Sequence, residues 1–324
     1  MKGLMSTLAS IDVGTLTARL LISRKEEGPH FFKPILRKRA YISLAEDFDA
    51  ENRARLQPEA IKRALSVLED FAVVTRAHHV DMTRAVATGV MRRATNKEDL
   101  LAPVFNNTGI RVKVITGEEE ARLTGEGVAH FLKLPDRPFM VFDLGGGSTE
   151  FMLVNSLDGK ARSIPLGAMI LTDQYFQSDP PEEKAEKALA DHVDKTLRET
   201  FTGRPDSCDG ESLVATGGTV TTLAAMFHGL KRSEINPDRM NGLILKREDI
   251  EALFSRMRKM TVLERSNLDL LDEDRARVIL AGTLIVIRIL HFFKSNQVIV
   301  SLSDILEGLL VDYLKGVKDG TKGY

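Results

Sequence analysis

The sequence predicts an α/β fold built from two similar halves, and three observations support that prediction. Candidate strands alternate with candidate helices along the chain, which is typical of α/β domains. The length of 324 residues suits two domains. An apolar run, an Asp–x–Gly turn and a second apolar run occur together twice, in residues 8–21 and in residues 141–154. We therefore expect two halves that face each other across a cleft, each supplying one phosphate loop.

Apolar spacing places the elements of the first half. Strands are expected at Leu8–Ile22 (two short strands around a turn), Phe31–Leu36, Thr83–Ala87 and Val112–Ile115. Apolar residues that recur every three or four positions predict helices at Pro58–Val74, Lys97–Phe105 and Glu118–Leu132. The last of these begins with three acidic residues, which suits the positive end of a helix dipole.

The second half repeats this alternation. Strands are expected at Phe139–Val154 (two strands around a turn), Lys160–Ile164, Ser212–Ala215 and Gln297–Ser301. Helices are expected at Pro181–Phe201, Thr219–Phe227, Arg247–Lys259, Asp274–Phe293 and Asp304–Leu314. The Gly- and Lys-rich residues after position 314 are expected to be disordered.

The composition argues against several classes of partner. The formal net charge is -1 and the pI is about 6.7, so we expect no DNA partner. The longest apolar run, Val278–Ile287, is too short to cross a bilayer, so we expect no membrane partner. The single cysteine, Cys208, excludes an internal disulfide and is typical of a reducing compartment. We therefore expect a cytoplasmic protein.

The second hairpin has the composition of a phosphate and metal site. Three consecutive glycines, Gly145, Gly146 and Gly147, let bare backbone N–H groups approach an anion. Two glycines suffice for an ordinary hairpin turn, so the third and the flanking acids need another explanation. The residues predicted to bind phosphate are the three glycines, Ser148 and Thr149, and those predicted to bind Mg²⁺ are Asp143 and Glu150.

Two further turns offer groups for anion binding. In the first hairpin Asp12 ends a strand and is predicted to be a third Mg²⁺ ligand. Gly14, which permits the turn, and the hydroxyl groups of Thr15 and Thr17 are predicted to bind phosphate. A later strand ends in two glycines at the start of a helix, where free N–H groups and the helix dipole attract anions. The residues predicted to bind phosphate in that turn are Gly217, Gly218 and Thr219.

Charged residues at two strand ends are candidates for catalysis. Thr88-Gly89 follow a strand and precede Arg92 and Arg93, which suit bidentate phosphate binding, although such a pair can also be exposed surface charge. Three glutamates, residues 118–120, follow another strand and a glycine. Such a run is commonly a solvated first helical turn, but one of its members could be a general base that deprotonates attacking water.

Together these motifs resemble the actin/Hsp70/sugar-kinase superfamily and, within it, the exopolyphosphatase/guanosine pentaphosphate phosphatase (Ppx/GppA) family. The motifs that carry the resemblance are ATGVMRRATN (87–96), TGEEEARL (116–123), DLGGGSTE (143–150), PLG (165–167), ATGGTVTTLA (215–224) and VSLSDILEGLL (300–310). The resemblance implies two actin-like (ribonuclease H-like) domains flanking an interdomain cleft. Residues 1–125 would form the first, with a C-terminal helix of about 302–316 packing back on it. Residues 126–301 would form the second, and 317–324 a flexible tail.

The resemblance also implies an activity and roles for residues. It implies Mg-dependent hydrolysis of a terminal phosphoanhydride bond in inorganic polyphosphate or guanosine pentaphosphate, with guanosine tetraphosphate as a further ligand and a role for a monovalent cation left open. Glu120 matches the family's general base, Glu150 its second essential glutamate, and Arg92 its arginine. Asp12 and Asp143 match the acids of the two phosphate loops. Family members are often dimers, so a homodimer is left open.

The chain departs from the family pattern in two places, and other functions therefore stay open. Leu16 stands where the first loop usually has Asn, and Arg277 stands where the late helix usually has Asp. One alternative is a non-catalytic protein that binds polyphosphate or guanosine tetra- or pentaphosphate. The other is an ATP-dependent small-molecule kinase on the same fold. Longer family members continue into further C-terminal domains, so the resemblance implies a short, two-domain member.

Overall fold

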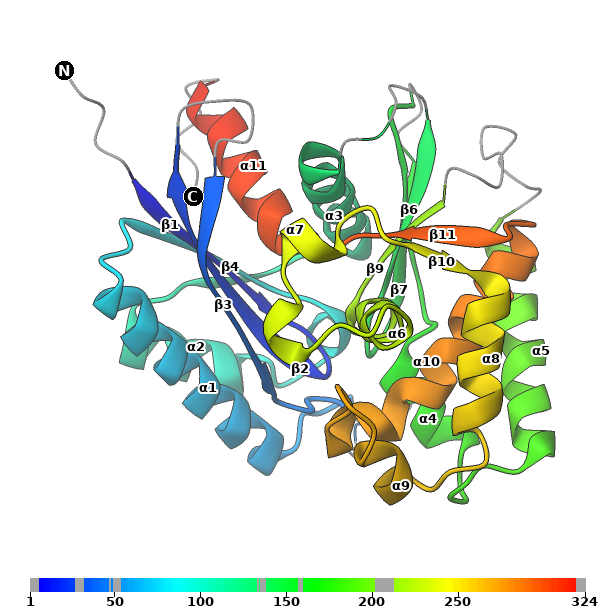
Figure 1. The fold of residues 1–324 in the computed structure, drawn as a ribbon. Coiled ribbons are helices and arrows are strands. Elements are labelled where there is room, and N and C mark those ends of the chain that lie inside the picture. Colours follow the sequence, from blue (N-terminus) through cyan, green and yellow to red (C-terminus); the bar gives the residue numbers. More distant parts are fainter. Residues whose placement is uncertain are drawn as a thin grey trace. The chain divides into compact units, whose positions relative to one another are not determined.

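A computed structural model describes residues 6–26, 32–46, 48, 54–132, 134, 138–156, 160–201 and 213–318 (Figure 1). The chain divides into two compact units. Unit 1 comprises Met1–Phe131 and Ile305–Tyr324, and unit 2 comprises Leu132–Asp304. Cys208 lies outside the described residues.

Unit 1 contains a mixed five-stranded sheet in the order β3-β2-β1-β4-β5. Strands β1, β2 and β3 form an antiparallel meander, while β4 and β5 lie parallel to β1. The strands are β1 (Thr7–Val13), β2 (Thr17–Lys25), β3 (Phe32–Tyr41), β4 (Met82–Ala87) and β5 (Val112–Val114).

The helices of unit 1 cover both faces of this sheet. They are α1 (Pro58–Ala77), η1 (a 3₁₀ turn, Gly89–Arg92), α2 (Glu98–Thr108), α3 (Gly117–Phe131) and α11 (Ile305–Lys318). Leu20 and Leu21 are both fully buried although neighbouring strand residues point to opposite faces, so both faces are covered. Helix α1 contacts β2, and α11 contacts β1, β2 and α3 (Figure 1).

Unit 2 contains a six-stranded sheet in the order β10-β11-β9-β6-β7-β8. The strands are β6 (Phe139–Leu144), β7 (Thr149–Val154), β8 (Ala161–Ile164), β9 (Leu213–Thr216), β10 (Ile244–Lys246) and β11 (Gln297–Val300). Strands β6, β7 and β8 are antiparallel, whereas β9 and β11 run parallel to β6. Without β10, this sheet has the same strand order and directions as the sheet of unit 1, so the predicted duplication is present in the topology.

Helix α10 (Glu273–Phe292) lies at the centre of the unit 2 core. Most of its residues from Arg275 to Leu290 are buried. The other helices of this unit are α4 (Ala168–Tyr175), α5 (Glu183–Thr200), α6 (Gly218–Phe227), η2 (a 3₁₀ turn, Arg232–Glu234), α7 (Pro237–Met240), α8 (Arg247–Met257) and α9 (Val262–Ser266). Within the described ranges no helix combines the length and the apolar character that a membrane crossing requires.

The structure confirms the predicted α/β class, but several elements differ from the sequence expectation. Strand β3 continues to Tyr41 instead of ending at Leu36. Its charged residues do not end the strand, because an edge strand can expose charged side chains and because Arg37 pairs with the buried Glu307 of α11. Helices α4, α7 and α9 and strand β10 were not predicted from the sequence. Helix α11 continues to Lys318, so residues 315–318, which were expected to be disordered, belong to a helix, while 319–324 lie outside the described residues.

Candidate functional site

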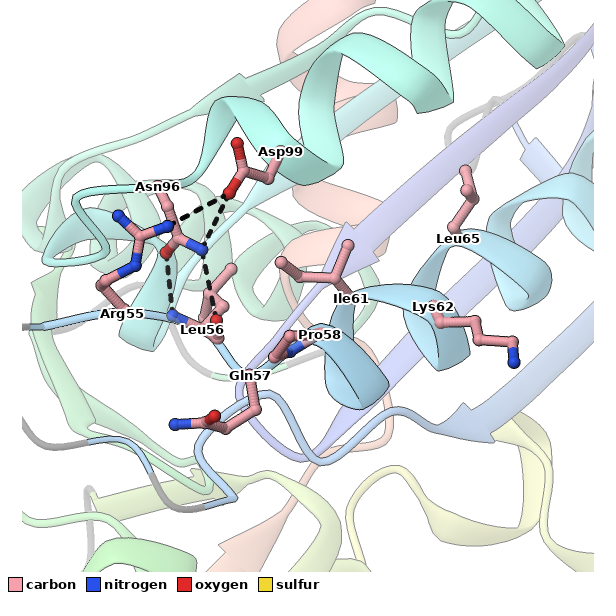
Figure 2. Close-up of a pocket in the computed structure, with 9 residues that line it drawn as sticks. All are labelled: Arg55, Leu56, Gln57, Pro58, Ile61, Lys62, Leu65, Asn96 and Asp99. Atoms are coloured by element: carbon pink, nitrogen blue, oxygen red, sulfur yellow. Dashed lines mark hydrogen bonds and ion pairs between the residues drawn. The ribbon is translucent and has the colours of Figure 1, made fainter.

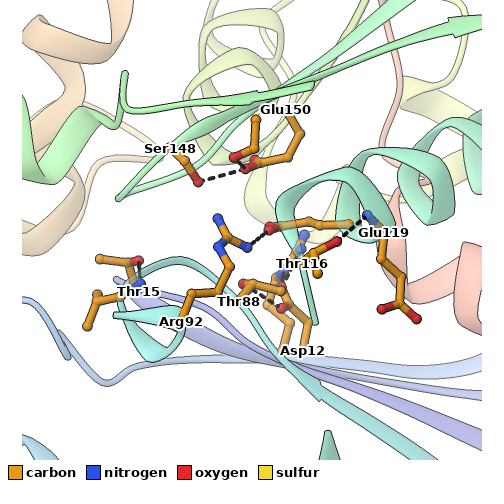
Figure 3. Close-up of polar contacts among 12 residues, drawn as sticks. Asp12, Thr15, Thr88, Arg92, Thr116, Glu119, Ser148 and Glu150 are labelled. Atoms are coloured by element: carbon orange, nitrogen blue, oxygen red, sulfur yellow. Dashed lines mark hydrogen bonds and ion pairs between the residues drawn. The ribbon is translucent and has the colours of Figure 1, made fainter. Parts of the chain in front are cut away.

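The first hairpin places an aspartate opposite an arginine. Asp12 on β1 is paired in register with Arg19 on β2. The Arg19 guanidinium donates to Oδ2 of Asp12 from Nε (3.1 Å) and from Nη2 (2.7 Å). The Thr88 hydroxyl donates to Oδ1 at 3.3 Å (Figure 3 shows Asp12 and Thr88). Asp12 is only 5% exposed, so this bidentate pair neutralises a buried carboxylate within unit 1.

The turn of the first hairpin is joined to the loop that carries Arg92. The Gly14 amide donates to the Thr17 carbonyl at 3.0 Å and closes the turn. The Thr15 hydroxyl accepts from the Val90 amide at 3.1 Å. The Leu16 side chain is buried, so this departure from the family pattern adds apolar contact to the core of unit 1 in place of an amide group.

Among the three adjacent glutamates, Glu120 alone is buried. Glu118 is exposed, and Glu119 pairs with Lys113 at 2.9 Å. The Glu120 carboxylate accepts through Oε2 from Nη1 of Arg92, which is labelled in Figure 3. The structure therefore singles out the glutamate that the family resemblance assigns as the base.

The two adjacent arginines have different environments. Arg92 ends the 3₁₀ turn and pairs with Glu120, whereas the guanidinium of Arg93 lies 5.7 Å from the ring centroid of Phe48. The two predicted phosphate ligands therefore point to different neighbours, and Arg92 is the one that accompanies the candidate base.

The second hairpin places two carboxylates opposite each other. Asp143 on β6 is paired in register with Glu150 on β7, and both are buried. Oε1 of Glu150 accepts from the hydroxyls of Ser148 (2.7 Å) and Ser163 (2.6 Å) (Figure 3 shows Ser148 and Glu150). Directly opposed like charges are destabilising in a sheet. A cation bound at this pair would relieve that repulsion.

The three-glycine turn packs against the start of α4. The amides of Ala168 and Met169 donate to the carbonyls of Gly145 (3.0 Å) and Gly146 (2.9 Å). A Cβ atom at Gly167 would lie only 2.3 Å from the Gly147 carbonyl carbon. This close approach explains why the PLG segment ends in glycine, and it fixes the conformation of the turn.

The later glycine pair lies beside Asp143. A Cβ atom at Gly217, whose φ is +98°, would lie 2.7 Å from Oδ1 of Asp143. A Cβ atom at Gly218 would lie 2.3 Å from Nη2 of the buried Arg275. The N-terminus of α6, a carboxylate pair and an arginine therefore meet in unit 2.

Three predicted hydroxyl ligands make different contacts. The Thr149 hydroxyl donates to the Leu166 carbonyl, and Thr219 packs against Gly282 of α10. Both threonines are buried, at 0% and 1% exposure, so their side chains serve the unit 2 core. Thr17 begins β2 and is half-buried. Phosphate binding by these three residues stays a prediction.

The acidic residues differ in how well they suit Mg²⁺. The described residues contain no group of three or more His, Cys, Asp or Glu side chains suited to a metal. Mg²⁺ commonly takes one or two carboxylates together with water and substrate oxygens, so the opposed pair of Asp143 and Glu150 fits this ion. Asp12 fits less well, because its carboxylate is already paired with the positive charge of Arg19.

A cavity of about 550 Å³ opens elsewhere in unit 1, at the start of α1 (Figure 2). Its lining consists of Arg55, Leu56, Gln57, Pro58, Ile61, Lys62, Leu65, Asn96 and Asp99. The Asn96 amide bonds both backbone groups of Leu56 and the Asp99 carboxylate. None of the predicted site residues lines this cavity.

Sequence reasoning missed several residues that contact the candidate site. Arg19, Ser163 and Arg275 were not predicted as site residues. Arg19 could have been identified from the sequence, because it is a cationic residue within the apolar run of β2, where core residues are otherwise expected. The other two carry no comparable local signal.

Fold and site together define a duplicated, actin-like α/β protein with one Asp–x–Gly hairpin in each unit. Residues 21–316 match the Ppx/GppA phosphatase family, and the chain belongs to that family. The crystal structure of the Aquifex aeolicus family member has a TM-score of 0.79 and 32% identity, covering 97% of this chain and 99% of that one. The structure of an exopolyphosphatase from Cytophaga hutchinsonii has a TM-score of 0.84 and 26% identity, covering 96% and 98%.

Curated relatives carry two kinds of name. Exopolyphosphatase 2 of Mycobacterium tuberculosis is 30% identical over 319 residues, 94% of this chain and 98% of the relative. A bifunctional 3-dehydroquinate synthase/phosphatase of Fusobacterium nucleatum is 31% identical over 320 residues, and the chain spans only 46% of its length.

Proposed function

We propose that this protein is a Mg²⁺-dependent hydrolase that releases terminal phosphate from inorganic polyphosphate. Family membership and the exopolyphosphatase names of full-length relatives support this substrate. Guanosine pentaphosphate has the same kind of terminal anhydride, and the family that the motifs resemble includes guanosine pentaphosphate phosphatases. It is therefore the second candidate substrate.

The observation that carries the proposal is the Glu120–Arg92 pair. A buried carboxylate at the start of a helix, contacted by a guanidinium, brings a base and a phosphate-binding group together within unit 1. In the proposed reaction Glu120 orients the attacking water and takes its proton. Arg92 binds oxygens of the phosphoryl group that is transferred.

The carboxylates of unit 2 supply the second part of the proposed chemistry. Asp143 and Glu150 would hold Mg²⁺, which would neutralise charge on the phosphate oxygens when bound. Ser148 and Ser163 orient the Glu150 carboxylate through their hydroxyls. The amides of the glycine turn and of the α6 N-terminus favour anion binding by their dipoles.

The test compares matched glutamate variants. Phosphate release is measured from long polyphosphate, short polyphosphate and guanosine pentaphosphate, with Mg²⁺ and with EDTA. Glu120→Gln should lower kcat by about 10²–10⁴-fold while leaving substrate binding within a few-fold. Glu118→Gln is the control, because it removes the same charge from an exposed position two residues earlier.

The outcomes separate the three functions. Mg²⁺-dependent release that is lost in Glu120→Gln and kept in Glu118→Gln supports the hydrolase, and the ranking of rates identifies the substrate. Tight binding of polyphosphate or guanosine pentaphosphate without any release would favour the binding protein. ATP-dependent phosphorylation of a small metabolite would favour the kinase.

A further inference from the structure

A glycine of α11 packs directly against α3, the helix that carries the candidate base. Gly308 is buried in α11, and a Cβ atom there would lie 1.9 Å from the Leu123 carbonyl oxygen of α3. The same atom would lie 2.6 Å from the Leu123 carbonyl carbon. Both are backbone atoms, which cannot rotate away, so only glycine permits this spacing of the two helices.

The junction around Gly308 is tightly packed and crosslinked. Its apolar part is a buried cluster of Val86, Ile115, Leu123, Ile305 and Leu309. Its polar part contains two ion pairs between the helices, Arg122 to Asp312 at 3.2 Å and Glu126 to Lys315 at 3.0 Å. Arg84 of β4 also contacts Asp312, at 3.2 Å. A displacement of α11 would therefore move α3 as well.

This junction lies one helical turn from Glu120. Leu123 follows Glu120 by three residues in α3, and the Glu120 amide donates to the Thr116 carbonyl at the start of that helix. A helix segment of this length moves as one body because its backbone hydrogen bonds hold its geometry. The spacing at Gly308 therefore sets the place of the Glu120 carboxylate relative to Arg92.

We propose that Gly308 is a positioning residue for the general base, acting through the backbone of α3. The inference rests on the proposed role of Glu120. Gly308 contacts neither substrate nor water in this scheme. It permits the helix spacing at which Glu120 reaches Arg92, and any side chain at this position would push the start of α3 away.

The direct test is Gly308→Ala. The new methyl group would have to move about 1.5 Å to reach an ordinary van der Waals separation of about 3.4 Å. Misplacement of a catalytic group by about 1 Å can cost about 10²-fold in rate. We expect kcat for phosphate release to fall about 10- to 100-fold while KM stays within about threefold.

A control variant separates positioning from loss of stability. Gly109 follows α2 in the same unit with φ of +76°, and a Cβ atom there would meet nothing within 4 Å. Gly109→Ala therefore strains the backbone without displacing a neighbour. Its melting temperature should fall while kcat, measured well below that temperature, stays at the wild-type value.

A second variant decides the matter if Gly308→Ala does not fold. Leu309→Ala removes a buried side chain of the same cluster and leaves room in place of a clash. We expect a fall in kcat of about fivefold at unchanged KM, accompanied by faster hydrogen exchange of the amides in the first turns of α3.

Each result supports or overturns the inference. A folded Gly308→Ala or Leu309→Ala protein whose kcat stays within twofold of wild type overturns it. The wild type and Glu120→Gln are assayed in parallel on long polyphosphate. If Glu120→Gln is as active as wild type, the proposed base is wrong. If Glu120→Gln is inactive and Gly308→Ala is fully active, only the positioning role fails.

Discussion

The two hairpins have the same strand pairing, but the residues opposite their aspartates have opposite charges. In unit 1 the residue opposite Asp12 is Arg19, and in unit 2 the residue opposite Asp143 is Glu150. The first aspartate is neutralised by a bidentate ion pair within its own sheet. The second faces another acid. The residue at one cross-strand position thus distinguishes a hairpin whose aspartate is already paired with an arginine from a hairpin suited to bind a cation.

In both units a nearby segment of the chain donates backbone hydrogen bonds to the hairpin turn, but the two segments differ. In both units the chain that follows the third strand of the sheet returns to the turn and donates amides to its carbonyls. In unit 1 these are Ile42 to Leu16 (2.9 Å) and Leu44 to Thr15 (2.8 Å). In unit 2 the donors begin α4, whose close packing on the glycines leaves no side chain between the backbones. In unit 2 the backbone of this segment is therefore packed directly on the backbone of the turn.

The largest effect is expected at the acidic hairpin. Glu150→Gln should lower kcat for phosphate release about 10³-fold and weaken Mg²⁺ binding, because one of the two proposed metal ligands loses its charge. Mg²⁺ affinity is measured by titration calorimetry on the substrate-free protein. Asp12→Asn is the matched control and should leave that affinity within twofold. Equal weakening in both variants would contradict the assignment of the metal to unit 2.

A smaller effect, on stability, is expected at the neutralised hairpin. Arg19→Gln leaves the buried Asp12 carboxylate without its ion pair and should lower the free energy of unfolding by about 2 kcal/mol. Urea denaturation in EDTA measures it. Adding Asp12→Asn should recover most of the loss. Glu150→Gln should not lower the free energy of unfolding in EDTA, because it removes a like charge. A loss similar to that of Arg19→Gln would contradict the proposed difference between the two hairpins.

The smallest effect distinguishes two hydroxyl donors. Ser163→Ala removes one hydrogen bond to Glu150, and a loss of about 1 kcal/mol corresponds to about fivefold weaker Mg²⁺ binding. Thr88→Ala removes a hydroxyl that donates to Asp12 and should leave Mg²⁺ binding unchanged. Calorimetric titration of both variants tests this. Identical affinities for the two would mean that Ser163 does not orient a metal ligand.

Much of the fold was predictable because its signals are local. The Asp–x–Gly hairpins, the glycine pair before α6 and the helix that begins with three glutamates all follow from neighbouring residues. The environments of those residues were not predictable. Glu120 is the same residue type as Glu118, and only the structure shows that Glu120 is buried and paired with Arg92. The Thr149 side chain serves the core because a distant carbonyl accepts its hydroxyl.

The missed elements have a similar physical cause. Strand β3 extends through Arg37, Lys38 and Arg39, whose charges obscure the strand pattern until their pairing with β2 is known. Helix α4 spans only eight residues, so its apolar period is too short to identify from sequence. Arg275 contacts Gly218 from another helix, and such long-range contacts leave no trace in local spacing.

The return of α11 to unit 1 has a consequence for the order of synthesis. Unit 2 is a continuous stretch of chain, whereas unit 1 needs residues from 305 onwards. Domains fold as units while translation proceeds at about 5–20 residues per second. Unit 2 is therefore synthesised in full before α11, the helix that covers Leu8, Leu21 and Phe32 of the earlier-made unit 1. The nascent chain exposes that apolar surface until its last helix is made.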